Sequence, residues 1–240
     1  MKQLITLEDA LYKRQSIRSY DMNGLSQEEL KEIEDYVKSI DHLISELKYS
    51  AQIVGPNDIK AIAKWRAPHY FLLYSEDSTE GRMNVAYIYE QLVIYLTSLG
   101  IGTCWATSIS PKEGKEKDGL KWCATIAFGK TEQDILRDSS SIKRKSLSEI
   151  SDQNDERLEA VRIAPSSMNN QPWYFKHNGE TIEVLCKKQG LLKKWMIEQN
   201  HIDMGIALGN LKIANKELTY TPFENKEEEN GYIVFGEMKL

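Results

Sequence analysis

The most regular pattern in this 240-residue sequence is an apolar helix that ends at a glycine. Large apolar side chains recur at steps of three and four residues from Val85 to Leu96, and Gly100 then stops the repeat in the manner of a helix cap. Residues 123–128 follow as a short apolar segment that ends at Gly129. The pattern predicts a long helix and, after it, a buried strand.

The second half of the chain repeats this order. Apolar residues favour a helix over 202–218 and a last strand over 232–235, which ends at a glycine. The sequence Ile-Ala-Phe-Gly at 126–129 is matched by Ile-Val-Phe-Gly at 233–236. The matched order of helix and strand predicts two related halves.

Two glycines, Gly205 and Gly209, lie four residues apart in the second predicted helix. On one helical face they permit the close approach of another helix or of a ligand, and we favour the helix contact. In the first half, Thr6 is suited to cap a first helix, and the capping box that starts at Ser26 opens a second. The aromatic run His69–Tyr74 favours a buried strand.

Polar and charged residues dominate the stretch Asp134–Glu156, which we interpret as a connector on the surface. The end of an amphipathic helix over 156–163 and a loop over 164–172 follow. The dipeptide Asn178-Gly179 then predicts a hairpin between two short strands. Helices and strands in this order indicate an α+β fold.

Composition excludes several classes of protein. The chain has 31 basic and 36 acidic residues, and a net charge of −5 argues against a general nucleic-acid binder. Three cysteines (Cys104, Cys123 and Cys186) without a CxxC pair indicate neither a disulfide scaffold nor a zinc site. The four histidines are scattered and predict no metal site. With no secretory signal and no apolar segment long enough for a bilayer, we expect a cytoplasmic protein.

Two segments of the first half carry residues suited to an anionic or flat ligand. Arg14-Gln15-Ser16-Ile17-Arg18 places two guanidinium groups around a hydroxyl, which suits a phosphate, although a solvated basic helix end has the same residues. Residues 99–105, Leu-Gly-Ile-Gly-Thr-Cys-Trp, let the backbone approach a ligand closely. A helix cap followed by a strand explains the first glycine equally well.

The third segment is the loop Ala-Pro-Ser-Ser-Met-Asn-Asn-Gln-Pro-Trp at 164–173. Its amides and hydroxyls could read the edge of a flat heterocycle, and a polar turn would have a similar composition. Together the three segments resemble the flavin-dependent nitroreductase family, whose members carry R-x-S-x-R, A-P-S-x-x-N-x-Q-P-W and G-L-G-T-C-W-like motifs. The match covers almost the whole chain and is most specific at 164–173.

The order of the motifs departs from that of an ordinary family member, in which the A-P-S loop precedes the central helix. Here the corresponding region, 49–60, has no such loop, and the second half has no R-x-S-x-R. Because family members are intertwined homodimers, the resemblance implies a nitroreductase-like fold with two related α/β halves, 1–150 and 151–240, that form an intrachain pseudo-dimer. The two halves would be interdependent and share one site. A further homodimer stays open.

The resemblance implies that FMN is the cofactor and NADH or NADPH the hydride donor. Arg14, Ser16 and Arg18 would hold its phosphate, ribityl and pyrimidine ends, with Lys143, Arg144 and Lys145 near the phosphate unless they are a solvated basic run. The isoalloxazine ring would be lined by residues of both halves: Thr103, Cys104, Trp105 and Ala106 from the first, and Pro165, Ser166, Ser167, Met168, Asn169 and Gln171 from the second.

The implied function is an FMN-dependent NAD(P)H oxidoreductase of nitroreductase type. Hydride would pass through flavin N5 in a ping-pong cycle to nitroaromatic, quinone or similar electron-poor small molecules. No catalytic side chain is required, and we interpret Cys104 as an apolar filler rather than a redox group. Two alternatives remain: a reductase with one specialised substrate, such as a dehalogenase or enoate-type enzyme, and a binding module that retains the fold without catalysis.

Overall fold

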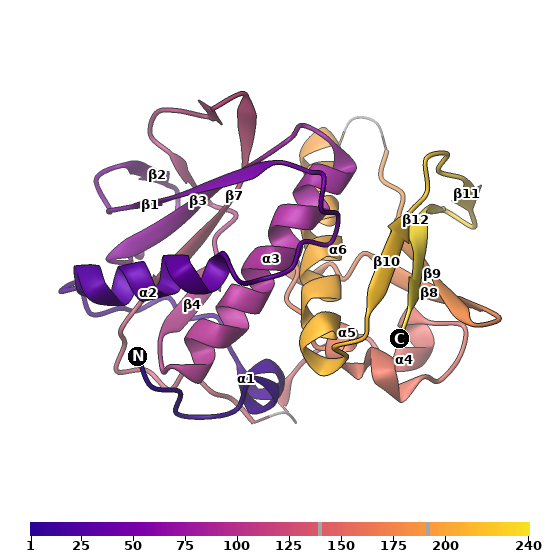
Figure 1. Cartoon of the computed structure of the whole chain (residues 1–240), viewed down its shortest axis with the longest axis horizontal. Helices are drawn as coiled ribbons and strands as arrows, with labels where there is room; N and C mark the ends of the chain where they lie inside the picture. The colour runs from indigo at the N-terminus through magenta and orange to yellow at the C-terminus, as the bar shows by residue number, and fades with distance from the viewer. Residues whose placement is uncertain (139–140, 191–192) are drawn as a thin grey trace.

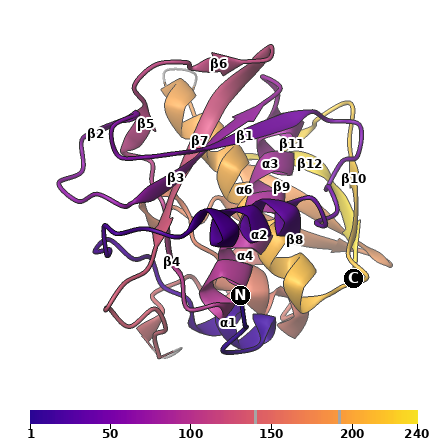
Figure 2. The same ribbon diagram turned by 60° about the vertical axis from the view of Figure 1, so that its left-hand side comes forward.

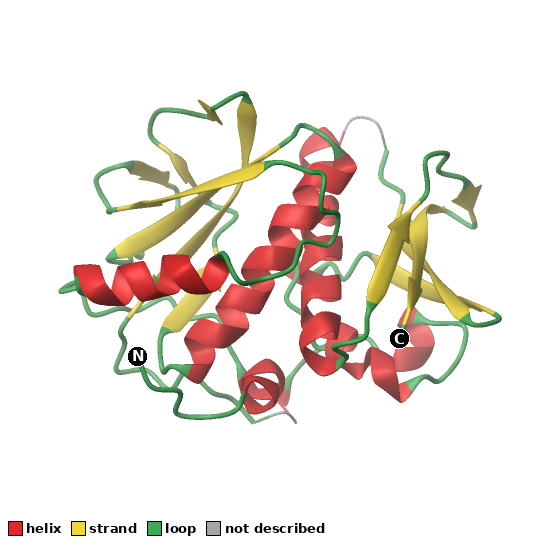
Figure 3. Ribbon diagram, in the orientation of Figure 1, coloured by secondary structure: helices red, strands yellow, loops and turns green. Residues whose placement is uncertain are grey.

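The computed structural model describes residues 1–138, 141–190 and 193–240 and has a pair of long helices at its centre (Figure 1). Helices α3 (Thr79–Ser98) and α6 (Lys194–Ala214) pack side by side in both views (Figures 1 and 2). The strands lie on the two outer sides of this pair, as the colours of Figure 3 show. The apolar pattern of the first predicted helix is confirmed, with Gly100 in the left-handed conformation at its end (φ +82°).

Two sheets in the described residues have the same strand order. The first runs β1 (Tyr49–Val54), β3 (His69–Ser75), β7 (Leu120–Gly129), β4 (Gly102–Trp105), with β6 (Glu116–Lys117) paired to β7. The second runs β8 (Trp173–Asn178), β9 (Thr181–Lys187), β12 (Tyr232–Lys239), β10 (Thr219–Pro222), with β11 (Glu228–Glu229) paired to β12. Neighbouring strands are antiparallel in both. This shared topology supports the prediction of two related halves.

The glycines of α6 let the two central helices approach closely. A Cβ atom on Gly205 would lie 2.2 Å from the Met83 carbonyl oxygen of α3, and one on Gly209 would lie 2.8 Å from the Tyr87 carbonyl oxygen. Real side chains essentially never reach such distances from a backbone atom. The helix contact that we favoured over a ligand contact is therefore confirmed.

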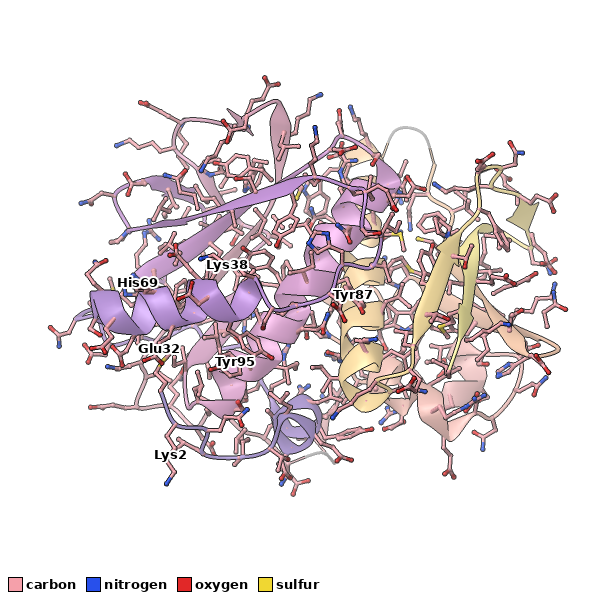
Figure 4. All side chains as sticks on the ribbon, viewed as in Figure 1. Lys2, Glu32, Lys38, His69, Tyr87 and Tyr95 are labelled. Atoms are coloured by element: carbon pink, nitrogen blue, oxygen red, sulfur yellow. The ribbon has the colours of Figure 1, made fainter. Side chains whose placement is uncertain are left out.

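Shorter helices complete the fold. Helix α1 (Leu7–Lys13) is capped by Thr6, and the Ser26 capping box opens α2 (Gln27–Val37), as predicted. Helix α2 packs on α3, where the Tyr36 and Tyr95 rings stack with centroids 3.5 Å apart. Figure 4 labels Tyr95 on α3. The remaining elements are the helices α4 (Leu147–Ile150) and α5 (Glu159–Arg162), the 3-10 turns η2 (Glu156–Leu158) and η3 (Ser167–Asn169), and a small pair of strands, β2 (Ile59–Ala61) and β5 (Ile109–Pro111).

Three predicted boundaries were wrong. Helix α6 begins eight residues before Ile202, because its first turns carry partly exposed side chains that break the apolar repeat, and it ends at Ala214 rather than Leu218. Strand β12 does not end at Gly236 but continues through a register shift to Lys239. A Cβ on Gly236 would lie 2.3 Å from the Thr221 carbonyl oxygen, so the glycine permits close strand packing instead of ending the strand.

The predicted connector, Asp134–Glu156, is largely irregular but contains α4, and residues 139 and 140 of it lie outside the described residues. The predicted hairpin is confirmed, with Gly179 at φ +61° in the turn between β8 and β9. No helix within 1–138, 141–190 and 193–240 has the length and apolar character needed to cross a membrane.

Candidate functional site

The two motif segments of the first half lie side by side. The segment from Arg14 to Arg18 follows α1 and runs parallel to β4, where the Ile17 amide donates to the Thr103 carbonyl oxygen at 2.9 Å. A Cβ on Gly102 would lie 3.0 Å from the Ile17 side chain. Glycine at 102 therefore lets the segment pack directly on the strand.

A pocket of about 330 Å³ lies between the two halves. Its wall from the first half includes Trp105 and Trp122, and its wall from the second half includes Trp195 and Ile202. The predicted site residues that line it are Ser16, Arg18, Trp105, Ala106, Pro165, Ser166, Ser167 and Met168. The structure thus brings both halves to one cavity, which is the arrangement a shared site requires. A wider groove of about 1280 Å³ beside α2 contains none of the predicted residues.

Other predicted residues lie next to the pocket without lining it. Thr103 and Cys104 are buried in β4, and the Cys104 thiol packs in an apolar cluster with Tyr70 and Ala127. Burial raises the pKa of that thiol. An uncharged thiol among apolar side chains agrees with its interpretation as a filler.

The side-chain amides of Gln171 and Asn169 hold the loop Ala164–Pro172 in place. The Gln171 side chain accepts a hydrogen bond from the Lys145 amide at 2.8 Å and donates one to the Asn169 carbonyl oxygen at 3.0 Å. Asn169 in turn donates to the Lys143 carbonyl oxygen at 3.3 Å. Met168, Asn169 and Gln171 all have positive φ, an unusual conformation for these residues. Asn169 and Gln171 therefore fix the loop and the segment 143–145 to each other outside the pocket.

Four arginines gather beside this loop: Arg14, Arg137, Arg144 and Arg162. Burial, together with the charges of the other three, lowers the pKa of the Arg144 guanidinium to about 10. The Nε atoms of Arg14 and Arg137 are buried and have no hydrogen-bond partner among the described residues. The Arg144 Nε atom donates to the Ala164 carbonyl oxygen at 2.9 Å, which places the cluster at the start of the loop. Arg162 is paired with Glu159, so the donors without a hydrogen-bond partner belong to Arg14 and Arg137. Crowded cations with such donors are the chemistry of an anion site.

Glu90 of α3 connects this arginine cluster to the pocket. It is fully buried, and its Oε2 atom accepts a hydrogen bond from the Trp105 indole at 2.6 Å. Its Oε1 atom lies 3.9 Å from the Arg14 Nε atom. Burial raises the pKa of Glu90 to about 7, against the opposing effects of Arg14 and Trp105. One carboxyl group therefore contacts both a cluster arginine and a pocket tryptophan.

A second buried acid, Asp203 of α6, lines the pocket itself. Its Oδ1 atom accepts a hydrogen bond from the Ser167 amide at 2.9 Å. Burial raises the pKa of Asp203 to about 8, and the Ser167 amide opposes the shift. Asp203 thus joins α6 to the loop, and its Oδ2 atom has no hydrogen-bond partner among the described residues.

Sequence reasoning did not find Arg137, Arg162, Glu90 or Asp203. For the two acids a signal was present, because each is a carboxylate within the apolar stretch of its helix. The two arginines have no such signal, since their position beside Arg14 depends on contacts between segments that are far apart in the sequence. Within the described ranges, no group of three or more His, Cys, Asp or Glu side chains is arranged to hold a metal ion.

Residues 6–215 match the model of a family described as "Putative TM nitroreductase". The chain belongs to this family. The resemblance deduced from the three sequence motifs is thereby confirmed, and membership supports a nitroreductase-like function in general terms. A comparison with curated protein sequences found no match.

Solved structures confirm the nitroreductase-like fold. A putative nitroreductase from Thermotoga maritima is 19% identical, with a TM-score of 0.62, and the match covers 98% of this chain and 95% of that one. A putative NAD(P)H:FMN oxidoreductase from Staphylococcus epidermidis is 11% identical, with a TM-score of 0.51, over 62% of this chain and 96% of that one. At these identities the likeness establishes the architecture and not the chemistry.

Proposed function

We propose that this protein is an FMN-dependent oxidoreductase that takes hydride from NADH or NADPH and reduces a small electron-poor acceptor, such as a quinone or a nitroaromatic compound. The observation that carries the proposal is the arginine cluster beside the loop Ala164–Pro172, which is connected to the pocket wall through Glu90 and Trp105. The buried Nε atoms of Arg14 and Arg137, which have no hydrogen-bond partner among the described residues, fit a phosphate group. Its negative charge would also offset the burial and the repulsion that together lower the pKa of Arg144.

The residues present would hold FMN at both ends. Arg14, Arg137 and Arg144 would bind its phosphate, and the Ser16 hydroxyl would add a neutral donor towards the pocket. Trp105 and Pro165 would enclose the ring from the first and the second half. When bound, the cofactor supplies the hydride transfer. The chain orients the ring, keeps water from it with apolar side chains and presents an electropositive site to the phosphate.

The same arrangement supports one site per chain and interdependent halves. The arginine cluster combines Arg14, Arg137 and Arg144 from residues 1–150 with Arg162 from 151–240. The pocket is likewise lined from both parts. A fragment that contained only one part would lose one wall of the pocket and part of the arginine cluster. We therefore propose a pseudo-dimeric chain that acts as one unit in the cytoplasm.

A flavin titration of the purified protein tests this function. We expect yellow protein with one FMN per chain, and anaerobic loss of the flavin colour on addition of NADH or NADPH, with return of the colour when a quinone is added. Colourless protein that does not bind added FMN would contradict the proposal. Two FMN molecules per chain would contradict the single shared site. Reduction of one acceptor alone would favour the specialised reductase.

A further inference from the structure

Asp203 has one oxygen that the fold does not use. The residue lies on α6 with 2% of its surface exposed, and its Oδ1 atom is held by the Ser167 amide. The Oδ2 atom is buried and has no hydrogen-bond partner among the described residues, although Asp203 lines the pocket. Leaving such an atom unpaired is costly, so the pocket suits a ligand atom that pairs with it.

The charged groups around Asp203 leave it without a cation. The buried Cys186 thiol of β9 faces Asp203. The pKa of this thiol is raised mainly by burial and, to a smaller extent, by Asp203. Six charged residues line the same pocket: Arg18, Asp77, Arg82, Lys121, Lys194 and Glu198. Arg82 contacts both Asp77 and Glu198, and Lys121 contacts Asp77 at 2.6 Å. None of these six pairs with Asp203 in the described part of the chain.

Because burial raises its pKa to about 8, Asp203 holds a proton at neutral pH. A protonated carboxyl group with a free oxygen is a hydrogen-bond donor inside the pocket. The Ser167 amide at Oδ1 would stabilise the carboxylate left after the proton departs. The geometry thus provides a source of one proton and a means of supporting the charge that remains.

We propose that Asp203 gives the proton that the acceptor takes up when it is reduced in this pocket, an inference that rests on the proposed function. Reduction of a quinone to a hydroquinone consumes one hydride, which carries both electrons, and one proton. The hydride originates from NADH or NADPH. The O–H bond at Asp203 Oδ2 breaks as an O–H bond forms on the acceptor oxygen, and the carboxylate then regains a proton from water.

The variant Asp203→Asn separates this role from a structural one. Its amide oxygen can still accept from the Ser167 amide, but its side chain has no acidic proton. We expect FMN affinity and the rate of flavin reduction by NADH or NADPH to stay within about twofold, since neither uses that proton. Reoxidation by a quinone should slow by about 10²-fold or more. Reoxidation by ferricyanide, which accepts electrons without a proton, should be unchanged.

A second measurement needs no cofactor. Infrared spectra of the flavin-free wild-type protein should show the carbonyl band of a buried, protonated carboxylic acid that fades as the pH rises past about 8. The buried Glu90, whose pKa is raised to about 7, contributes a component that fades at lower pH. The component that fades past about pH 8 should be absent from Asp203→Asn. It should persist in Glu217→Gln, a control that removes an exposed carboxylate in the same half of the chain.

Different results would contradict the inference about Asp203 and the proposed function. Normal quinone reoxidation in Asp203→Asn would overturn the inference alone. A large loss of FMN affinity in that variant would also overturn it, since Asp203 would then bind the ring rather than serve the acceptor. Wild-type protein that binds no FMN would overturn the proposed function and this inference with it.

Discussion

The two halves of the molecule share one strand order but differ at corresponding edges. In the first sheet, the edge strand β4 is mostly buried, because the segment around Ser16 and Ile17 packs on it. In the second sheet, the corresponding strand β10 alternates between exposed and half-buried residues. The two sheets therefore share one topology, but of these two edge strands only β4, whose Trp105 lines the pocket, is covered by another segment of the described chain. A repeated fold does not by itself repeat a site.

The halves also bring different parts to the pocket between them. The first half supplies Ser16 and Trp105, and the second supplies residues 165–168 of the loop and Asp203. In the region 49–60 of the first half, where an ordinary family member would have its own loop, the structure has β1 and β2. Each half therefore contributes residues to the pocket wall that the other does not.

The contact between the halves can be broken at Gly205, where we expect the largest effect. Alanine there would place its Cβ 2.2 Å from the Met83 carbonyl oxygen, a backbone atom that cannot move without its helix. We expect Gly205→Ala to lower the free energy of unfolding by about 3 kcal/mol, despite the better helix propensity of alanine. Urea denaturation measures this change.

Two matched variants show whether the helix contact is responsible. Gly209→Ala should destabilise less, because its nearest contact is 2.8 Å. Gly190→Ala meets nothing within 4 Å and should change stability by less than about 0.5 kcal/mol. If Gly205→Ala were as stable as Gly190→Ala, the close approach of α3 and α6 would be refuted.

The different roles of the two halves can be tested at Arg14, where we expect a change in FMN affinity that is smaller than the loss of stability at Gly205. On the proposed function, Arg14→Ala removes a charged donor to the phosphate and should weaken FMN binding by about 1.5–3 kcal/mol. Fluorescence titration with FMN gives the affinity. The control Arg66→Ala removes an exposed arginine of the same half that is remote from the pocket, and should bind FMN normally.

Removing Arg14 also takes the nearest cation from the buried Glu90 carboxyl group. The double variant Arg14→Ala, Glu90→Gln also removes this buried carboxyl group, which would otherwise lack a cation. It retains an acceptor for the Trp105 indole. It should fold at least as well as Arg14→Ala and still bind FMN weakly. Full FMN affinity in both variants would show that the phosphate lies elsewhere.

The smallest expected effect concerns a cluster that only the second half contains. His177 of β8 contacts Asp152 at 2.8 Å and Asp155 at 3.1 Å, and so fastens the connector to the second sheet. Burial lowers the pKa of His177, but the two carboxylates outweigh it, and the net pKa lies above 6.5. The resulting stability is complete below pH 6.5 and is lost as the pH rises through the raised pKa.

Compared with His177→Gln, the wild-type protein should therefore be more stable at about pH 5.5, by less than about 1 kcal/mol because the group is near the surface. The advantage should disappear at about pH 8.5. Urea midpoints at the two pH values test this. An advantage that increases with pH would mean that His177 is neutral in the cluster.

Much of the fold could be predicted because it depends on local signals. The apolar repeat from Val85 to Leu96, the Ser26 capping box and the Asn178-Gly179 turn each determine an element through neighbours in sequence. The start of α6 could not be predicted, since Trp195 and its neighbours are partly exposed and show no apolar stripe. Gly236 was wrongly predicted to end its strand. A glycine is needed there because the Thr221 carbonyl oxygen of a neighbouring strand lies close by, and the sequence does not show that contact.

For the site, the motifs predicted which segments meet but not how each side chain is used. Ser16 and Ser166 do line one pocket, although they are 150 positions apart in the chain. The amide of Gln171, by contrast, binds the backbone of Lys145 rather than the pocket. A polar side chain in a loop can satisfy either a ligand or the loop itself, and only the folded geometry decides which.

The glycines of α6 approach the backbone of α3 at Met83 and Tyr87, whereas Gly81 of α3 makes no such approach to α6. In a symmetric dimer of identical subunits, the same residues occur on both sides of the twofold axis, so the two facing helices cannot differ in sequence. In a single chain, each face of the contact is encoded separately. The connector also keeps the partners at an effective concentration of about millimolar order. Dilution that would part free subunits therefore leaves the pocket assembled.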